Sequence, residues 1–139
     1  MPADLSRSDY EELAELRYLI RRFLHFSESV ALEDGIEPRQ HQAMLAIKAM
    51  PADEPCTIGA LAERMFLHHQ SAVGLVDRLA LRKLVARAHG HEDARQVIVS
   101  LTKRGEEILK RLSVTHRKEL KESAPALAQA LRTIIRKSK

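Results

Sequence analysis

The stretch Thr57–Gly105, TIGALAERMFLHHQSAVGLVDRLALRKLVARAHGHEDARQVIVSLTKRG, decides the fold of this chain. Its first part carries two helical patterns a few residues apart, and its second part carries two β-type runs joined by a polar loop. A helix can enter the major groove of DNA, and a basic hairpin that follows it can reach the next groove. The order of these parts therefore predicts a helix-turn-helix followed by a β-hairpin that together hold DNA.

The two helices of this stretch are defined by apolar residues at helical spacing. Thr57 is a good N-cap, because its hydroxyl can accept a hydrogen bond from an early helical amide. The first helix then repeats Ile58, Leu61, Ala62 and Met65. Phe66 and Leu67 are predicted to be the apolar plug of the turn. The second helix opens at His68–Ser71 and is expected to bury Ala72, Leu75, Val76 and Leu79.

The hairpin is predicted from alternation and from a polar loop. Leu84 begins one extended run, and the second run alternates as a half-buried strand does, with Val97, Val99 and Leu101 on one face. Residues 88–96, AHGHEDARQ, are polar with one glycine, which suits a hairpin tip. Thr102 then caps a further helix.

The flanks are predicted to be helical. Ser8 caps a long first helix, and Gly35 ends it as a left-handed cap. Pro38 suits the first turn of a second helix, which Pro51 ends. Near the C-terminus, Pro125 is expected to break the helical pattern into two stripes. Neither terminal stripe fills a compact core by itself, so we expect both terminal regions to meet within and between two subunits.

Composition bounds the class of protein. The 139 residues make one domain-sized unit, and 45% apolar content is enough for a core. No run of about 18 uncharged apolar residues is present, which predicts no membrane-spanning helix. The polar N-terminus MPADLSRSDYEE is not typical of a secretory signal, and the single Cys56 suits a reducing compartment. We therefore expect a cytoplasmic protein.

Charge is distributed unevenly along the chain. Residues 1–56 hold 6 basic and 11 acidic side chains, a net charge of −5. Residues 57–105 hold 8 and 4, a net charge of +4, and residues 106–139 hold 9 and 4, a net charge of +5. A basic surface raises affinity for phosphates without choosing a sequence. A solvated basic face alone would explain +4 equally well, but the order of the motifs favours DNA binding.

Together these motifs resemble the winged helix-turn-helix of the MarR (multiple antibiotic resistance regulator) family. The resemblance is carried, in order and at the right spacing, by Leu75–Leu79, Lys83–Val85, Asp93–Arg95 and Leu101–Gly105. The length and the flanking helices also fit, so the resemblance covers nearly the whole chain. Ala94 stands where the family often has a first wing arginine, which implies fewer phosphate contacts. Lys83 stands where the family often has glycine, which implies a strained or differently shaped turn.

The resemblance implies a mainly α fold with a small β-hairpin wing (α+β). It implies one domain over residues 1–139, with a DNA-binding lobe at 57–105 and a helical dimerisation and ligand region at 8–50 and 105–138. It also implies a homodimeric regulator, a repressor, that reads a palindromic operator. In a two-fold dimer the half-sites lie about one DNA turn apart. The expected partners are double-stranded DNA, a second copy and a small aromatic or anionic effector, with no membrane and no cofactor.

Specific residues are assigned to DNA contact. Arg95 is implied to be the wing arginine that enters the minor groove, where narrow A·T tracts attract a guanidinium. Asp93 or Asp77 is expected to orient it through a bidentate pair. The remaining candidates lie on the second helix and the first strand: His68, His69, Gln70, Ser71, Val73, Gly74, Arg78 and Arg87. Gln pairs with adenine, while Ser and neutral His donate or accept. Each of these residues has an ordinary alternative as a cap, a packing residue or a surface charge.

Effector contacts are assigned to the helical region. The candidates are Tyr18, Arg21, Arg22, His25 and His41. Each of them can equally be a helix-face or interface residue. An effector would act by favouring one spacing of the DNA-binding lobes over another.

Other chemistry has little support in the sequence. His89, His91 and Asp93 alternate, but no ligand spacing of a structural zinc site appears, so no metal is expected. Cys56 fits a buried thiol better than a redox sensor. No phosphate-binding glycine loop, nucleophile elbow or HExxH pattern is present, so no enzyme is expected. The alternatives are an architectural DNA binder with low sequence preference and a winged-helix module for protein interaction.

Overall fold

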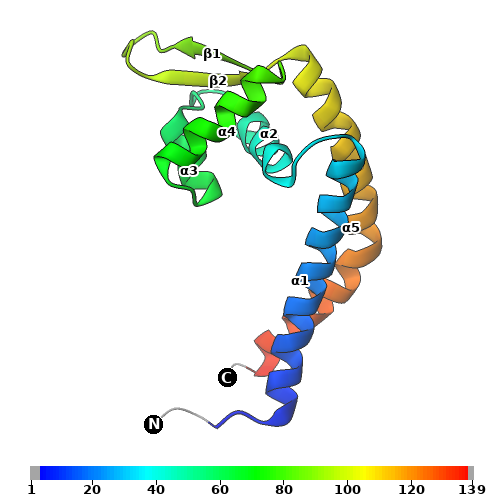
Figure 1. Cartoon of the computed structure of the whole chain (residues 1–139). Helices are drawn as coiled ribbons and strands as arrows, with labels where there is room; N and C mark the ends of the chain where they lie inside the picture. Colours follow the sequence, from blue (N-terminus) through cyan, green and yellow to red (C-terminus); the bar gives the residue numbers. More distant parts are fainter. Residues whose placement is uncertain (1–3, 138–139) are drawn as a thin grey trace. The chain divides into compact units, whose positions relative to one another are not determined.

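The computed structural model describes residues 4–137, which form five helices and one two-stranded hairpin (Figure 1). Their bounds are α1 (Arg7–Glu33), α2 (Pro38–Ala49), α3 (Ile58–Met65), α4 (His69–Leu81), β1 (Val85–His89), β2 (Val97–Leu101) and α5 (Lys103–Lys137). The predicted fold class, mainly α with a β-hairpin wing, is confirmed. The chain divides into two compact units, one made of residues up to Val30 and from Val114 onward, the other of Ala31–Ser113.

The first unit pairs most of α1 with the later part of α5. The reciprocal bonds that cap α1 join Ser6 to Asp9: the Ser6 hydroxyl accepts from the Asp9 amide at 3.2 Å, and the Asp9 carboxylate accepts from the Ser6 amide at 2.9 Å. The prediction that Ser8 caps this helix is therefore wrong, because Ser8 already lies within the first turn. Further along, His116 of α5 is buried, with its Nε2 2.6 Å from the Ser27 hydroxyl.

The aromatic residues of α1 complete this packing around His116. The ring centroids of Phe23 and Phe26 lie 6.2 Å and 5.9 Å from that of His116, both in edge-on geometry. Such edge-to-face contacts are favourable beyond the area they bury. They fix the inner face of α1 against α5 in this unit.

α5 is one continuous helix, which corrects the predicted break at Pro125. Proline removes one helical N–H and crowds the preceding turn, but it does not end a helix whose other bonds remain. Here Pro125 is exposed, and the helix continues through it to Lys137. The predicted C-terminal boundary at residue 138 lies outside the described residues.

The second unit begins where α1 turns into α2. Gly35 has φ +73°, and the amides of Gly35 and Ile36 donate to the Leu32 and Ala31 carbonyls at 2.9 and 2.8 Å. These bonds confirm the predicted left-handed cap. Pro38 opens α2 as predicted, and the Gln40 side chain reaches back to the Glu37 amide.

The core of the second unit lies among α2, α3, α4 and the start of α5. The predicted buried face of α4 is confirmed, since Ala72, Leu75, Val76 and Leu79 are all buried. Other fully enclosed side chains come from the neighbouring elements: Ile36, Met44, Leu61, Leu84 and Leu112. Burial of a large aliphatic side chain contributes about 1.5–3 kcal/mol, so this core fixes α4 relative to the hairpin.

The turn between α3 and α4 differs from the prediction. Phe66 has φ +54° and is 97% exposed, so it is not an apolar plug. It ends α3 as a left-handed C-cap, and this backbone conformation directs its side chain into solvent. Leu67 is half-buried, and its amide donates to the Ala62 carbonyl at 2.9 Å. The packing role therefore belongs to Leu67 alone.

The hairpin pairs β1 and β2 in antiparallel register from Val85–Leu101 to His89–Val97. β1 extends through His89, so the connecting loop is shorter than the predicted 88–96 and covers residues 90–96. The loop closes on itself, because the Gly90 amide donates to the Gln96 carbonyl at 3.1 Å. At the other end of the hairpin, the Thr102 hydroxyl donates to the Lys83 carbonyl at 2.7 Å and accepts from the Gly105 amide at 3.0 Å. The predicted cap of α5 is confirmed.

Across residues 4–137, none of the helices combines the length and the apolar character that a membrane crossing needs.

Candidate nucleic-acid interface

α4 presents the predicted contact residues on its open side. His68 is the N-cap, with an extended backbone and no capping bond from its side chain. His69, Gln70, Ser71, Asp77 and Arg78 are exposed, and Val73 and Gly74 are half-buried. Because the opposite face of α4 is held in the core, these side chains are free to meet a ligand at the surface.

An ion pair joins α4 to the hairpin. The Arg87 guanidinium on β1 donates to the Asp77 carboxylate on α4, and both side chains are about half exposed. Asp77 is one of the two aspartates that the sequence offers as partners of Arg95, but its partner in the structure is Arg87. Asp77 therefore positions the strand that leads to the wing rather than the arginine at its tip.

The wing tip is ordered by its own aspartate. The Asp93 carboxylate accepts from the Arg95 amide at 3.0 Å, from Arg95 Nε at 3.2 Å and from Arg95 Nη2 at 3.4 Å. These bonds from the Arg95 side chain, and then from its backbone, lower the pKa of Asp93 below the usual carboxyl value. The Arg95 side chain itself is 92% exposed. A fully charged guanidinium is thus held at the tip and left accessible to an anion.

A groove connects α4 with the hairpin and with the first turn of α3. Its volume is about 360 Å³, and its lining is Thr57, Ile58, Gly59, His69, Val73, Val76, Asp77, Arg87, Arg95, Gln96 and Val97. The groove therefore brings together His69, Val73, Arg87 and Arg95 from the predicted contacts. The lining leaves out Gln70, Ser71, Gly74 and Arg78, which belong to the same open side of α4.

Sequence reasoning missed two contributors to this groove. Gln96 follows Arg95 in the wing and lines the groove beside it. The first turn of α3 also lines it through Ile58 and Gly59. Gly59 was the signal in the sequence that could have indicated this, because a glycine in the first turn of a helix lets another group approach the backbone closely.

The predicted effector residues lie in two different units. Tyr18, Arg21, Arg22 and His25 are exposed on the α1 part of the first unit, whereas His41 is buried in α2 of the second. Of these, Arg22 lines a small cavity of about 100 Å³, together with Phe23 of α1 and Leu120 of α5.

Two further features bear on other chemistry. Cys56 is buried, and burial raises the pKa of its thiol, which lowers the fraction of reactive thiolate. Within residues 4–137, no group of three or more His, Cys, Asp or Glu side chains is arranged to hold a metal ion.

Comparison with known proteins gives a family match for part of the chain. The sequence model of the MarR family matches residues 34–96, which include α2, α3, α4, β1 and the whole wing loop. No curated protein sequence matches the chain.

Solved structures of low sequence identity share the fold. A MarR family protein from Bacillus stearothermophilus has 22% identity and a TM-score of 0.75, with 96% of this chain and 97% of that chain covered. A mutant of S. aureus MepR bound to an oligodeoxyribonucleotide has 14% identity and a TM-score of 0.69, with 98% and 100% covered. CouR from Rhodococcus jostii bound to p-coumaroyl-CoA has 21% identity and a TM-score of 0.66, with 76% and 72% covered. At these identities the similarity establishes the winged helix-turn-helix fold.

Proposed function

We propose that this chain, whose residues 34–96 match the sequence model of the MarR family, is a member of that family and a sequence-specific DNA-binding transcriptional repressor that acts as a homodimer. The observation that carries the proposal is the groove where the open side of α4 and the tethered Arg95 of the wing lie together. A helix that reads base edges and a nearby free guanidinium are complementary to a duplex.

Each element has a separate task in this mechanism. α4 enters the major groove, where Gln70 and Ser71 offer hydrogen bonds to base edges and Val73 offers an apolar contact to a thymine methyl group. Arg95 enters the adjacent minor groove, oriented by Asp93. Arg78 and Arg87 contribute phosphate contacts that set the register without reading sequence.

A homodimer contains two copies of α4 and of the wing. Two lobes related by a two-fold axis bind two half-sites about one helical turn apart, so the operator is palindromic. A small aromatic or anionic effector shifts the population of lobe spacings and releases DNA. The CouR structure, which holds an aromatic thioester, supports an effector of this class. The protein acts in the cytoplasm, where such an operator is accessible.

The proposal is tested by selecting duplexes from a random pool at a stated salt concentration. A palindromic consensus is the expected result. Equal affinity for every duplex with a steep salt dependence would instead indicate an architectural binder. Absence of duplex binding even at low salt would indicate a module for protein interaction.

Removal of the wing guanidinium provides the first mutational prediction. Arg95→Ala weakens binding to the selected operator by about 10- to 100-fold, since one well-placed arginine is worth ~1–3 kcal/mol. The midpoint of thermal unfolding should be the same for Arg95→Ala and the parent protein, because the Arg95 side chain is almost wholly exposed. Fluorescence anisotropy at fixed salt measures the binding.

Arg39→Ala is the matched control for this variant. Arg39 is also an exposed arginine of the second unit, but it lies on α2, away from the residues that line the groove. It should bind the operator like the parent protein. Equal affinity of Arg95→Ala and the parent protein would contradict the role of the wing.

A further inference from the structure

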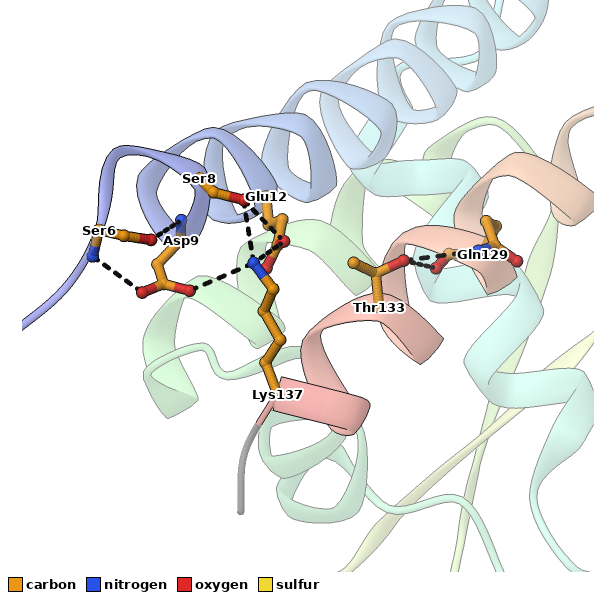
Figure 2. A network of polar contacts seen from close by, with 7 residues as sticks. All are labelled: Ser6, Ser8, Asp9, Glu12, Gln129, Thr133 and Lys137. Atoms are coloured by element: carbon orange, nitrogen blue, oxygen red, sulfur yellow. Dashed lines mark hydrogen bonds and ion pairs between the residues drawn. The ribbon is translucent and has the colours of Figure 1, made fainter.

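Several polar contacts join helices that lie far apart in the sequence. In the first unit, Lys137 Nζ of α5 lies 2.7 Å from Glu12 Oε1 of α1 (Figure 2). In the second unit, Lys48 Nζ of α2 lies 2.9 Å from Glu106 Oε2 of α5. Both lysines are exposed, and ion pairs at an exposed surface contribute little to stability. A contact at the C-terminal end of α4 differs from these, because its acceptor is enclosed.

Arg82, at the end of α4, is bonded to a buried side chain of α2. Its Nη1 donates to Gln40 Oε1 at 2.9 Å. Gln40 is only 2% exposed, whereas Arg82 is half-buried. The same Gln40 oxygen accepts from the Glu37 amide at 3.2 Å, and this bond is part of the cap of α2. The backbone of α2 therefore holds the acceptor in one orientation, independently of Arg82.

The Arg82 guanidinium also lies beside the turn between α1 and α2. A Cβ added to Gly35 in this turn would lie 3.9 Å from Arg82 Nη2. Arg82 is itself the C-cap of α4, and a positive charge is favourable at the C-terminus of a helix. Within the second unit, Arg82 thus connects the end of α4 to the start of α2.

The direction of α4 matters because its two ends have different tasks. The buried apolar side chains of α4 contribute a non-directional free energy, whereas a hydrogen bond requires a narrow range of distance and angle. The proposed base-reading residues Gln70 and Ser71 lie at the N-terminal end, and Gln70 is about 18 Å from Arg82 along the helix axis. A tilt of about 5° at the Arg82 end would move Gln70 by about 1.5 Å, which is enough to break a hydrogen bond.

We propose that Arg82 and Gln40 are positioning residues for the reading of base edges, because their bond fixes the tilt of α4. The inference rests on the proposed function and adds two residues that lie outside the lining of the candidate interface. Gln40 is too deeply buried to contact a duplex, so its replacement can affect DNA binding only through α4. The alternative for Arg82 is a direct phosphate contact, because the ion pairs found among residues 4–137 do not include it.

Replacement of each partner by methionine in the full chain tests this role. Gln40→Met and Arg82→Met should each weaken binding to the operator duplex obtained by selection at least about tenfold, since base contacts are lost. Binding to a duplex of shuffled sequence should stay within about twofold of the parent, with the same salt dependence, since phosphate contacts remain. Because both variants lose the same bond, the double variant should bind the operator like either single one. Fluorescence anisotropy at several salt concentrations measures these affinities.

Gln40→Glu is the conservative variant. Its carboxylate can accept from both the Glu37 amide and the Arg82 guanidinium, so operator binding should stay near that of the parent. The matched controls are Gln42→Met and Arg39→Met, because both residues are exposed on the same helix α2. Both controls should bind the two duplexes like the parent. Circular dichroism and thermal unfolding report whether each variant is folded at the temperature of the binding experiment.

Two results would overturn the positioning role while leaving a sequence-specific regulator intact. If Arg82 contacts a phosphate, Arg82→Met weakens binding to both duplexes alike and lowers the salt slope by about one, and Gln40→Met has no effect. If the bond only stabilises the fold, both variants unfold at a lower temperature but keep the parental ratio of operator to shuffled-duplex affinity.

A parent protein that binds all duplexes equally would instead overturn the proposed function and this inference together. If Gln40→Met fails to fold, Gln40→Asn gives the same reading, because its amide is one methylene shorter and loses the bond to Arg82.

Discussion

Two residues other than glycine have a left-handed backbone conformation, which glycine adopts more readily. Phe66 ends α3 with φ +54°, and Lys83 follows α4 with φ +62°. A non-glycine residue in this region is crowded by its own Cβ, at a cost of about 1–2 kcal/mol. Packing of the side chain does not offset this cost at either residue, because both side chains are exposed.

Replacement of either residue by glycine should therefore stabilise the fold. For Phe66→Gly and for Lys83→Gly we expect the free energy of unfolding to rise by about 0.5–1 kcal/mol, which is the relief of strain less the greater chain entropy of glycine. Urea denaturation followed by circular dichroism measures the change.

Gly35→Ala is the opposite control for the same backbone argument. Gly35 has φ +73°, and a Cβ there would meet only the end of the Arg82 side chain, at 3.9 Å. Any loss of stability would therefore come from the backbone conformation, and we expect the unfolding midpoint to fall. A midpoint that falls for Phe66→Gly as well would mean that the aromatic ring contributes to the fold.

The sequence predicts the conformation or partner of a single residue only where neighbouring residues in the chain determine it. The strained turn at Lys83 was predictable, because a lysine stands where the family that the chain resembles often has glycine. The prediction that Phe66 is buried is wrong, because the sequence does not reveal the left-handed backbone angle that turns this apolar side chain into solvent. Two aspartates were candidate partners of Arg95, and only the structure assigns Asp93 to Arg95 and Asp77 to Arg87.

The close approach between the start of α5 and the hairpin explains a glycine in that helix. A Cβ on Gly105 would lie 2.2 Å from the Leu84 carbonyl oxygen, which is backbone and cannot turn aside. Gly105→Ala should therefore destabilise the protein by about 1–3 kcal/mol, as overpacking does in a core. Thermal denaturation at several scan rates measures the effect.

Gly74→Ala in α4 is the matched control for this substitution. The nearest atom to its added Cβ is Nη1 of the flexible Arg78 side chain, at 3.5 Å. Alanine also favours a helix interior over glycine by about 0.5–1 kcal/mol, so we expect this variant to be more stable than the parent. Equal effects of the two substitutions would contradict the close approach at Gly105.

The elements themselves were largely predictable, and their ends were less so. The periodicity of α4 identified its buried face, and Thr57, Thr102 and Gly35 marked caps that the structure contains. The start of α1 was not predictable in this way, because the bond to Asp9 that makes Ser6 the cap in place of Ser8 is visible only in the structure. The predicted break at Pro125 is wrong, because the sequence does not reveal that the helical turns on both sides of the proline keep their hydrogen bonds.

Association of two copies should be visible in the stability of the whole molecule. If the folded dimer is the most stable state, its thermal midpoint rises with protein concentration by mass action. Between about 1 and 100 μM we expect an increase of a few degrees, because a hundredfold excess over the dissociation constant is worth about 2.7 kcal/mol. Calorimetry across this range measures it, and a constant midpoint would indicate a monomer.

The boundary between the two units falls inside helices rather than in a loop. α1 passes from one unit to the other at Val30, and α5 passes back at Ser113. Ala31 and Leu112, which flank these crossings, are buried. A fragment cut at the boundary would therefore end in two severed helices with unsatisfied backbone groups. The second unit therefore cannot be moved into another protein as a separate module. A hybrid protein that contains it must also take the whole of α1 and α5.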